Sequence, residues 1–493
     1  MTRGSVCRII DTERANLAPN PIRGAIPGPG VASRPGRSQA IEHQPTPSIS
    51  PSPAPLDRFE AWPRTAPLAA LINLHPRGSR PQILARPAHV RLFTAADLDQ
   101  TDPFALLRDT PRDHPPRDQT VLFAAAYGLG TLLEPSAAAS RPVPSRDALL
   151  IADLANAWRQ DRPDGPWAKR GDPPAIEPDE PDKYKPDKFE PDAGGPAAIE
   201  LGEPESATGR DGFIEAVRRA VGYIHAGDVF QVNLTHRLTL PLRGHPRDFF
   251  AALVRAASPA HGAYIELPDG RAICSVSPEL FLSYDARSRR LATEPMKGTR
   301  PLRTTDDTAA RELFDSAKDR AELAMIVDLM RNDLGRVARF GTVRVDDPRR
   351  VEAHGDSVLQ ATARVSAELR AGLGFADAMA LAFPPGSVTG APKIRAMQLI
   401  DELEPVERGF YCGAIGRIDP DGDAECSVAI RTAVVSPPNA DGVRTVSYHV
   451  GCGIVADSDP EAEWRESLDK AEVLRRVVRE HPPRAASKQG ASA

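Results

Sequence analysis

The spacing of apolar residues changes near position 209 of the chain. Beyond this point, apolar side chains recur every three or four positions, at Phe213, Val217, Val221 and Ile224. Such spacing places them on one face of a helix, and a glycine, here Gly227, commonly follows the last turn. The pattern therefore predicts a helix that ends near Gly227 and is followed by a strand over residues 229–234.

Three further helices are predicted downstream. One is expected to run from near Asp306 to Leu334. The other two open at Pro392 and Pro460, because proline is favoured at the first helical position. Asp459 is expected to cap the last helix, since its carboxylate can accept a hydrogen bond from a free backbone N–H of the first turn.

Strand patterns lie between the last two helices. Alternating apolar runs over 409–418 and 424–435 are separated by the turn sequence Asp-Pro-Asp-Gly-Asp, which predicts a hairpin, and a third strand follows around 444–450. Hairpins combined with flanking helices are typical of the α+β class rather than of a doubly wound parallel sheet.

Composition divides the rest of the chain. Residues 1–58 are rich in proline, serine and arginine and hold too little apolar surface to offset the entropy of ordering, so we expect a disordered tail. A transit peptide is the less favoured interpretation, because prolines spoil its amphipathic helix. Residues 59–160 predict a short region packing on the domain that follows, and 161–208 a charged low-complexity linker. The main domain is expected to cover 209–481, and 482–493 are expected to form a second disordered tail.

Charge and cysteine content exclude several classes of protein. The net charge is -5 and the sequence pI is about 6.2, so no basic excess is available for nucleic acid or an anionic membrane. The five cysteines occur singly, which argues against a zinc ribbon and a disulfide framework. No apolar run approaches the roughly 18 residues of a membrane span. We therefore expect a cytoplasmic protein with no nucleic-acid and no membrane partner.

Lysine is scarce in the second half of the chain. Between residues 189 and 487 the only lysines are Lys297, Lys318, Lys393 and Lys470. A lysine is usually a solvated surface residue. Unlike arginine, however, it can lose its proton when desolvated and act as a nucleophile. The context of Lys297 and Lys470 favours a functional role for these two.

Acidic residues on two predicted helices suggest a metal site. Glu463, Glu466 and Lys470 follow i, i+3, i+7 spacing and so project from one helix face, which by itself is also typical of a solvated stripe. Glu322 lies among apolar residues of the other helix, where a carboxylate needs a partner. Carboxylates without histidine or thiolate ligands suit a hard cation, so we predict Mg²⁺.

Several features are suited to binding an anion. The segment 383–393, which contains Gly390 and Ala391, is a tight turn that leads into a helix and leaves backbone N–H groups free. The Gly-Cys-Gly sequence that ends at Gly453 offers the same after a strand, although each of these is more often a plain turn or cap. Arg431 is predicted within an otherwise apolar strand, where it needs a carboxylate partner.

These residues belong to longer motifs, and through them the chain resembles the chorismate-utilising enzymes over about residues 209–478. The motifs are Gly-Asp-Val-Phe-Gln-Val-Asn-Leu at 227–234, Ser-Pro-Glu-Leu-Phe at 277–281, Asp-Arg-Ala-Glu at 319–322, Asp-Leu-Met-Arg-Asn-Asp-Leu at 328–334 and Gly-Ile-Val-Ala-Asp-Ser at 453–458. The resemblance implies a single large α+β domain of two roughly orthogonal β-sheets flanked by helices, with a reduced amino-terminal region. Chorismate and magnesium would bind between the sheets.

Roles follow from the resemblance, residue by residue. It implies that Glu279 is the general acid for loss of the ring hydroxyl at carbon four and that Lys297 is a covalent nucleophile. Glu322 and Glu466, with Glu463 nearby, would hold Mg²⁺. The residues implied in substrate binding are Gln231, Thr299, Gly390, Ala391, Arg431, Gly453 and Lys470.

Three positions bear on the choice within the family. Members that add water to chorismate carry a lysine where this chain has Gln231, so the resemblance favours amination. Anthranilate synthases have alanine at the position of Lys297, whereas members that form 4-amino-4-deoxychorismate have lysine. Gln360 stands where anthranilate synthases place a histidine linked to pyruvate loss. The resemblance thus favours component I of an aminodeoxychorismate synthase, which supplies 4-aminobenzoate for folate synthesis.

Two other interpretations compete with this one. The first is component I of an anthranilate synthase. The second is a degenerate scaffold that only docks a glutaminase. No cysteine lies in a Gly-x-Cys-x-Gly setting, so no glutaminase is expected within this chain. Ammonia is therefore expected from a separate glutamine amidotransferase subunit or from solution.

Overall fold

The computed structural model describes most of the chain from residue 198 onward and parts of the region before it. The described residues are 56, 59–60, 68–72, 82–98, 103–109, 120–137, 147–160, 168–169, 198–301, 308–354 and 358–483. The tails predicted at 1–58 and 482–493 lie almost wholly outside these residues, and of the linker predicted at 161–208 only 168–169 and 198–208 are described.

Twenty strands are assigned among the described residues. The first ten are β1 Ala69–Ile72, β2 Gln82–Thr94, β3 Thr120–Ala125, β4 Asp147–Gln160, β5 Ala168–Lys169, β6 Glu200–Leu201, β7 Glu205–Ser206, β8 Gln231–Arg243, β9 His261–Glu266 and β10 Ala272–Ser277. The others are β11 Leu280–Asp285, β12 Arg290–Glu294, β13 Met296–Pro301, β14 Arg344–His354, β15 Val358–Glu368, β16 Gly390–Ala391, β17 Ala414–Ile418, β18 Ala424–Val428, β19 Thr432–Val435 and β20 Val443–Ile454.

The helices are distributed between these strands. They are α2 Ala95–Leu98, α3 Ala105–Asp109, α4 Leu129–Leu133, α5 Gly209–His225, α6 Pro246–Ala257, α7 Thr308–Asp315, α8 Ala317–Gly335, α9 Phe375–Ala382, α10 Lys393–Leu403, α11 Pro460–Asp469 and α12 Glu472–Glu480, with the 3₁₀ turns η1 Pro135–Ala137 and η2 Gly386–Val388. None of the described helices is both long and apolar enough to cross a membrane.

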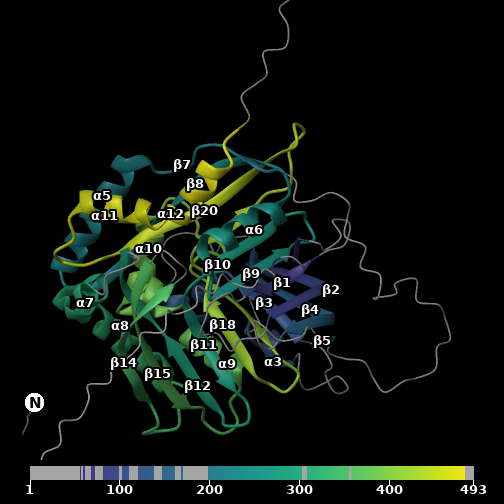
Figure 1. Ribbon diagram of the computed structural model, residues 1–493. Coiled ribbons are helices and arrows are strands. Elements are labelled where there is room, and N and C mark those ends of the chain that lie inside the picture. The colour runs from purple at the N-terminus through teal and green to yellow at the C-terminus, as the bar shows by residue number, and fades with distance from the viewer. Residues whose placement is uncertain are drawn as a thin grey trace, which may run out of the picture. The chain divides into compact units, whose positions relative to one another are not determined.

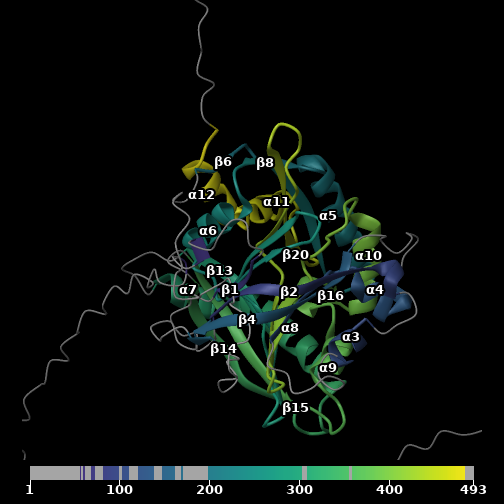
Figure 2. The same ribbon diagram turned by 90° about the vertical axis from the view of Figure 1, so that its right-hand side faces the viewer.

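Every strand pairing in the described part of the chain is antiparallel. One run of neighbours is β8, β20, β19, β10, β9 and β1. A second run is β2, β4, β3, β17, β18, β11, β12 and β15, and it meets the first where β1 also pairs with β2 (Figure 2). Antiparallel sheets with flanking helices confirm the predicted α+β class.

The strands before residue 161 are inserted into these sheets. β1 pairs with β9, and β3 pairs with β17 through Ala125 and Ala414. Residues Ser50–Ala493 accordingly form one compact unit. The region predicted at 59–160 therefore contributes strands of its own to the sheets as well as packing surface, while the boundaries expected at 161 and 209 stay predictions.

Helices cover the sheets and enclose the core. α11 packs against β20 and α5, α10 against β8, and α8 against β15 (Figure 1). The largest cluster of buried side chains joins these helices to the strands and includes Phe213 of α5, Ile326 of α8 and Leu399 of α10. The helical faces predicted from apolar spacing are thus the faces that the sheets bury.

Several predicted elements are interrupted in the structure. The helix expected over 306–334 is two helices, α7 and α8, because Ser316 caps α8 by accepting a hydrogen bond from the N–H of Asp319. The last helix also breaks, with Lys470 as the carboxyl-terminal cap of α11. Asp459 caps α11 as predicted, through a 2.8 Å bond from the N–H of Ala462.

The strand predicted over 424–435 is wrong at its centre. It divides into β18 and β19, and Arg431 lies between them with φ of 50°, in the left-handed region that a regular strand does not reach. The predicted hairpin is confirmed, since β17 pairs with β18 across residues 419–423. Pro392 is the N-cap of α10 rather than its first helical residue.

A buried ion pair ties the end of α10 to neighbouring segments. The Arg408 guanidinium bonds both carboxylate oxygens of Glu404, at 2.6 and 2.9 Å, and donates to the carbonyls of Val388 and Asn233. Glu404 accepts in turn from the N–H of Thr235 at 2.8 Å. Both charged residues are 5% exposed, so their hydrogen bonds must be made within the protein.

We expect removal of one partner of this pair to be costly. Arg408→Ala leaves the Glu404 charge buried without its counter-ion, so the free energy of unfolding should fall by about 3–5 kcal/mol. Urea denaturation measures the change. The control is Arg476→Ala, which removes an exposed pair with Glu480 and should change the free energy by less than about 1 kcal/mol. Equal effects of the two variants would contradict the structural role of Arg408.

Candidate active site

Three strands bring together sequence motifs that are far apart in the chain. β8 and β20 pair over their whole length, so that Gly453 lies opposite Asn233 and Ile454 opposite Val232. On the other edge of β8, Gly390 and Ala391 of β16 lie opposite Val232 and Gln231. The glycine segments predicted to bind anions therefore flank the beginning of β8 on both sides, although the Gly-Cys-Gly segment lies within β20 and does not follow a strand as predicted.

Gly390 has to be glycine for two reasons. Its φ is +141°, a conformation that other residues rarely adopt. A Cβ atom at this position would also lie 2.3 Å from the carbonyl oxygen of Gln231, which is far inside van der Waals contact. The close approach of β16 to β8 thus depends on the missing side chain.

Gly453 marks the point where two predicted site residues meet. A Cβ atom there would lie 2.6 Å from Nε2 of Gln231 and 3.0 Å from Nζ of Lys297. Gln231 is 1% exposed, and neither its Nε2 nor its Oε1 has a hydrogen-bond partner among the described residues. An amide that is buried without partners is costly unless a ligand supplies them. Gln231 and Lys297 thus face a common binding position beside the Gly453 backbone.

Lys297 is held in β13 and faces several charged groups. The strand pairs with β15, with Lys297 opposite Ala361. Burial lowers the pKa of Lys297, and the positive charge of Lys470 lowers it further, whereas the carboxylates of Glu322, Glu279 and Glu466 oppose this shift. The net effect is a lowered pKa, so the amine loses its proton more readily than an ordinary lysine does, and the neutral amine is the nucleophilic form.

Glu279 lies in the connection between β10 and β11. It is 4% exposed, and burial raises the pKa of its carboxyl group to about 7, although a hydrogen bond with the Ser387 side chain and the charge of Lys297 act in the opposite direction. A carboxyl group with this pKa is partly protonated at neutral pH. It can therefore donate a proton to a leaving group, as a general acid must.

The acidic residues of α11 lie beside the end of β20. Oε1 of Glu463 accepts a 2.7 Å hydrogen bond from Ser458, and burial raises the pKa of this carboxyl group. Nζ of Lys470 lies 2.9 Å from both Oε1 of Glu466 and the carbonyl oxygen of Gly451. The side chains of Lys470 and Glu466 are 45% and 53% exposed, so their ion pair remains in contact with solvent.

These carboxylates fit a cation in one respect that the structure shows directly. Glu463 is 6% exposed, yet its Oε2 has no hydrogen-bond partner in the described part of the chain. A carboxylate oxygen of Glu463 lies within 4.8 Å of one from Glu466, a spacing that a shared metal ion can bridge. A buried oxygen without a partner and a second carboxylate beside it are what a hard divalent cation requires.

Arg431 also lacks a partner. Burial lowers the pKa of its guanidinium, which the nearby Tyr448 hydroxyl opposes, and no described side chain forms an ion pair with it. The hydroxyl of Tyr448 is likewise unpaired, and burial raises its pKa to about 12. A half-buried cation next to an unpaired buried hydroxyl is suited to an anionic ligand.

The structure gathers most of the predicted residues, with some exceptions. Lys297, Gln231 and Gly453 are in direct proximity, and the charges of Glu279, Glu322 and Glu466 act on Lys297. The backbone of Thr299 lies in β13, but its side chain is outside the described residues. Among the described residues no hydrogen bond or ion pair joins Arg431 to Lys297, so the place of Arg431 in the same site stays a prediction.

Sequence reasoning missed two groups. Ser387 was noted only as part of a turn, yet its hydroxyl bonds the Glu279 carboxyl group. Tyr448 falls in the strand predicted around 444–450, which gives its hydroxyl no role, yet the charge of Arg431 acts on this hydroxyl in the structure. Both depend on contacts between distant segments, which spacing along the chain does not reveal.

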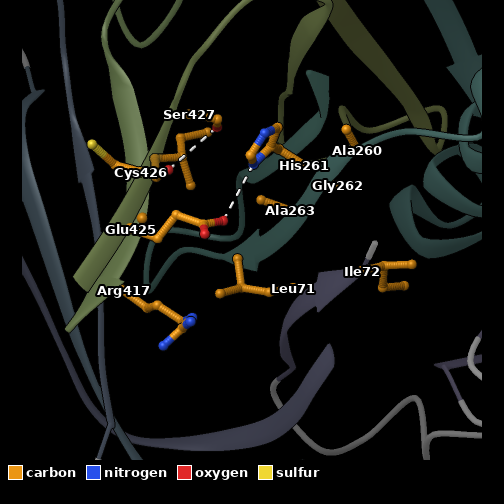
Figure 3. A pocket seen from close by; sticks show the side chains of 12 residues that line it. Leu71, Ile72, Ala260, His261, Gly262, Ala263, Arg417, Glu425, Cys426 and Ser427 are labelled. Carbon is orange, nitrogen blue, oxygen red and sulfur yellow. Dashed lines mark hydrogen bonds and ion pairs between the residues drawn. The ribbon is translucent and has the colours of Figure 1, made fainter. Parts of the chain in front are cut away.

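A separate small pocket lies between β1, β9, β17 and β18 (Figure 3). It has a volume of about 40 Å³ and is lined by residues that include His261, Glu425 and Arg417, with Nδ1 of His261 3.5 Å from Oε1 of Glu425. None of the predicted site residues lines it. Since a ligand pocket usually encloses about 300 Å³ or more, this one is too small for a ligand with a six-membered carbon ring such as chorismate.

Comparison with known proteins shows the family. Residues 72–476 match the model of the family described as chorismate binding enzyme. The chain belongs to this family. The match includes β2 to β4 as well as the strands and helices that carry Lys297, Glu279 and Glu466.

Named relatives fall into two groups. The chain is 45% identical over 271 residues to anthranilate synthase component 1 from Streptomyces coelicolor, which covers 54% of this chain and 51% of that protein. It is 40% identical over 271 residues to aminodeoxychorismate synthase component 1 from Bacillus subtilis, covering 54% and 56%. The chain thus spans about half the length of the curated relatives it matches.

Among solved structures, anthranilate synthase component I from Streptococcus pneumoniae TIGR4 is similar over 81% of this chain and 93% of that one. The TM-score is 0.65 and the sequence identity is 25%. The fold of that structure and the fold described above are therefore the same.

The pKa of Glu279 has a measurable effect on stability. Because the folded carboxyl holds its proton up to about pH 7 instead of 4.5, its stabilising contribution is complete below about pH 4.5 and is lost as the pH rises to about 7. A pKa of about 7 in place of 4.5 corresponds to about 3 kcal/mol in the free energy of unfolding. Relative to the wild type, Glu279→Gln should therefore gain stability between pH 5 and pH 8.

Urea denaturation of both proteins at the two pH values measures this difference. Glu480→Gln, a change at an exposed helix end, is the control and should follow the wild type. A constant difference between wild type and Glu279→Gln at pH 5 and pH 8 would show that Glu279 has an ordinary pKa.

Proposed function

We propose that this chain is component I of an aminodeoxychorismate synthase, which converts chorismate and ammonia to 4-amino-4-deoxychorismate. The observation that carries the proposal is the half-buried Lys297, whose amine lies beside the Gly453 backbone and whose pKa is affected by the charge of Glu279. The two groups have pKa values displaced toward each other by burial, as a nucleophile and a general acid require at neutral pH. The resemblance of the sequence motifs implies the same two roles.

The proposed reaction proceeds in two displacements. The neutral Nζ of Lys297 attacks ring carbon two of chorismate, the ring double bond shifts, and the carbon–oxygen bond at carbon four breaks. Glu279 gives its proton to the leaving hydroxyl, which departs as water. Ammonia then attacks carbon four, the double bond shifts back, and the bond from carbon two to Lys297 breaks. The excess proton of the ammonium group is available to return to Glu279.

The remaining residues bind and orient the substrate. Lys470 and Arg431 supply positive charge for its carboxylates, and Gln231 offers an amide with no protein partner. The backbone near Gly390 and Gly453 is proposed to contribute N–H groups to the binding of the substrate carboxylates. Glu322, Glu463 and Glu466 would hold Mg²⁺. When bound, this ion would offset the negative charge of the substrate carboxylates, which would otherwise be repelled by these acidic side chains.

Ammonia is proposed to come from a glutamine amidotransferase on a separate chain, or from ammonium salt in its absence. The product would serve the formation of 4-aminobenzoate and folate. The protein is proposed to act in the cytoplasm.

Anthranilate synthesis is the second candidate, because relatives with that name match the chain at 43–45% identity. One assay separates the candidates. The protein is incubated with chorismate, Mg²⁺ and ammonium salt. A product that a lyase converts to 4-aminobenzoate supports the proposal, and fluorescent anthranilate supports the second candidate. Absence of turnover would favour a scaffold that only docks a glutaminase.

Replacement of Lys297 tests the covalent step. We expect Lys297→Ala to reduce formation of 4-amino-4-deoxychorismate on the order of 10³-fold or more, since the nucleophile is gone. Lys297→Arg is the matched variant, because it keeps a positive charge that cannot be deprotonated. Mass spectrometry of the wild type with chorismate and no ammonia should show an adduct on Lys297. Turnover by Lys297→Ala at the wild-type rate would rule out the covalent step.

Replacement of the acidic residues tests the magnesium site. Glu322→Gln and Glu466→Gln substitute a neutral amide for a carboxylate, so calorimetry should show Mg²⁺ affinity reduced at least about 10-fold. Glu472→Gln, on the exposed face of α12, serves as control. If both site variants bind Mg²⁺ as the wild type does, the ion is held elsewhere.

A further inference from the structure

Cys452 differs from the other groups around the proposed magnesium site. It lies in β20 between Gly451 and Gly453, is fully buried, and its Sγ donates a 3.2 Å hydrogen bond to the backbone carbonyl oxygen of Glu463. Its Sγ and one carboxylate oxygen each from Glu463 and Glu466 lie within 4.8 Å of one another. The mechanism proposed above gives this thiol no task.

A second observation indicates that a ligand belongs beside this thiol. Oε2 of Glu463 has no hydrogen-bond partner among the described residues, although the residue is 94% buried, since its exposed fraction is 6%. A buried carboxylate oxygen in this condition needs a donor or a cation. Glu466, which is 53% exposed, provides the route by which an ion from solution reaches it.

We propose that Cys452, Glu463 and Glu466 form a binding site for a thiophilic divalent cation such as Zn²⁺. Mg²⁺ takes oxygen ligands almost exclusively, so it gains nothing from the sulfur atom. Zn²⁺ binds thiolate and carboxylate oxygen together in tetrahedral sites, and a set of three protein ligands leaves the fourth position for water. Upon binding, the sulfur–hydrogen bond of Cys452 breaks, a sulfur–zinc bond forms, and the proton is released to solvent.

The charges around the site act on every cation that could bind there. The ammonium group of Lys470 lies 2.9 Å from Oε1 of Glu466 and repels any cation there. The negative charge of the Cys452 thiolate offsets this repulsion only for a metal that sulfur binds strongly. The site shares Glu463 and Glu466 with the proposed magnesium site, so on the proposed function Zn²⁺ and Mg²⁺ exclude each other and Zn²⁺ acts as an inhibitor.

Cadmium provides a direct test, because a Cd²⁺–thiolate bond gives an ultraviolet charge-transfer band. The full chain is freed of metal with a chelator and titrated with Cd²⁺ in the absence of chorismate and Mg²⁺. The expected result is a band that saturates at one equivalent in the wild type and in Cys274→Ala, whose thiol is buried elsewhere. The band should be absent from Cys452→Ala. Its absence from the wild type, or its survival in Cys452→Ala, overturns the proposal.

Calorimetry with Zn²⁺ provides a second measurement that does not depend on the thiol variant folding well. Glu463→Gln should weaken Zn²⁺ binding at least about 10-fold, and the wild type should release one proton per Zn²⁺, seen as heat that varies with the buffer. Unchanged affinity in Glu463→Gln, or binding with no proton release, also overturns it.

Competition separates this inference from the proposed function. Excess Mg²⁺ should weaken apparent Zn²⁺ binding if the two sites share carboxylates. A thiolate band without Mg²⁺ competition would retain the Cys452 site and instead place the magnesium site elsewhere. Conversely, failure to form 4-amino-4-deoxychorismate would leave the Cd²⁺ band unaffected.

Discussion

The close approach of three backbones, β8, β16 and β20, is the constraint on which the site depends. Side chains at Gly390, Gly451 or Gly453 would collide with backbone or side-chain atoms of β8 or with Lys297. Because these positions are glycines, β16 and β20 can pair closely with the two edges of β8 near its start, and Gln231 is the first residue of β8. The buried Arg408–Glu404 pair then fixes the same strand to α10 and to η2 through Asn233, Thr235 and Val388.

Burial within this arrangement shifts the pKa values of an acid, Glu279, and a base, Lys297, in opposite directions. Removal from water disfavours the charged form of an acid and of a base alike, so it raises the pKa of Glu279 and lowers that of Lys297. An ion pair between them would restore both charges, and their mutual attraction does oppose each shift. Burial still prevails, because the desolvation of each group is the largest contribution to its own shift.

Much of the catalytic region was predictable from the sequence, because its signals are local. Apolar spacing located α5, the Asp-Gly turn located the β17–β18 hairpin, and Asp459 located the start of α11. The break at Arg431 was not predictable, since its left-handed backbone occurs at a residue other than glycine, within a run whose pattern is that of one strand. Nor was the partner of Glu279, because Ser387 is more than 100 positions away along the chain. Short apolar runs before residue 161 gave no indication of which strands they would join.

The pairing of early strands with late ones affects how the protein folds during synthesis. Strand β3 is synthesised early but pairs with β17. The pairing of Ala125 with Ala414 can therefore form only after the later strand has been synthesised. The entropy of closing so long a loop is lost before the stabilising contacts between the two strands form. Such topologies therefore fold slowly, and strand edges stay unpaired in the meantime. A ribosome-bound nascent chain is therefore committed to holding an incomplete sheet until the second half of the polypeptide emerges, and this interval is where chaperones would engage it.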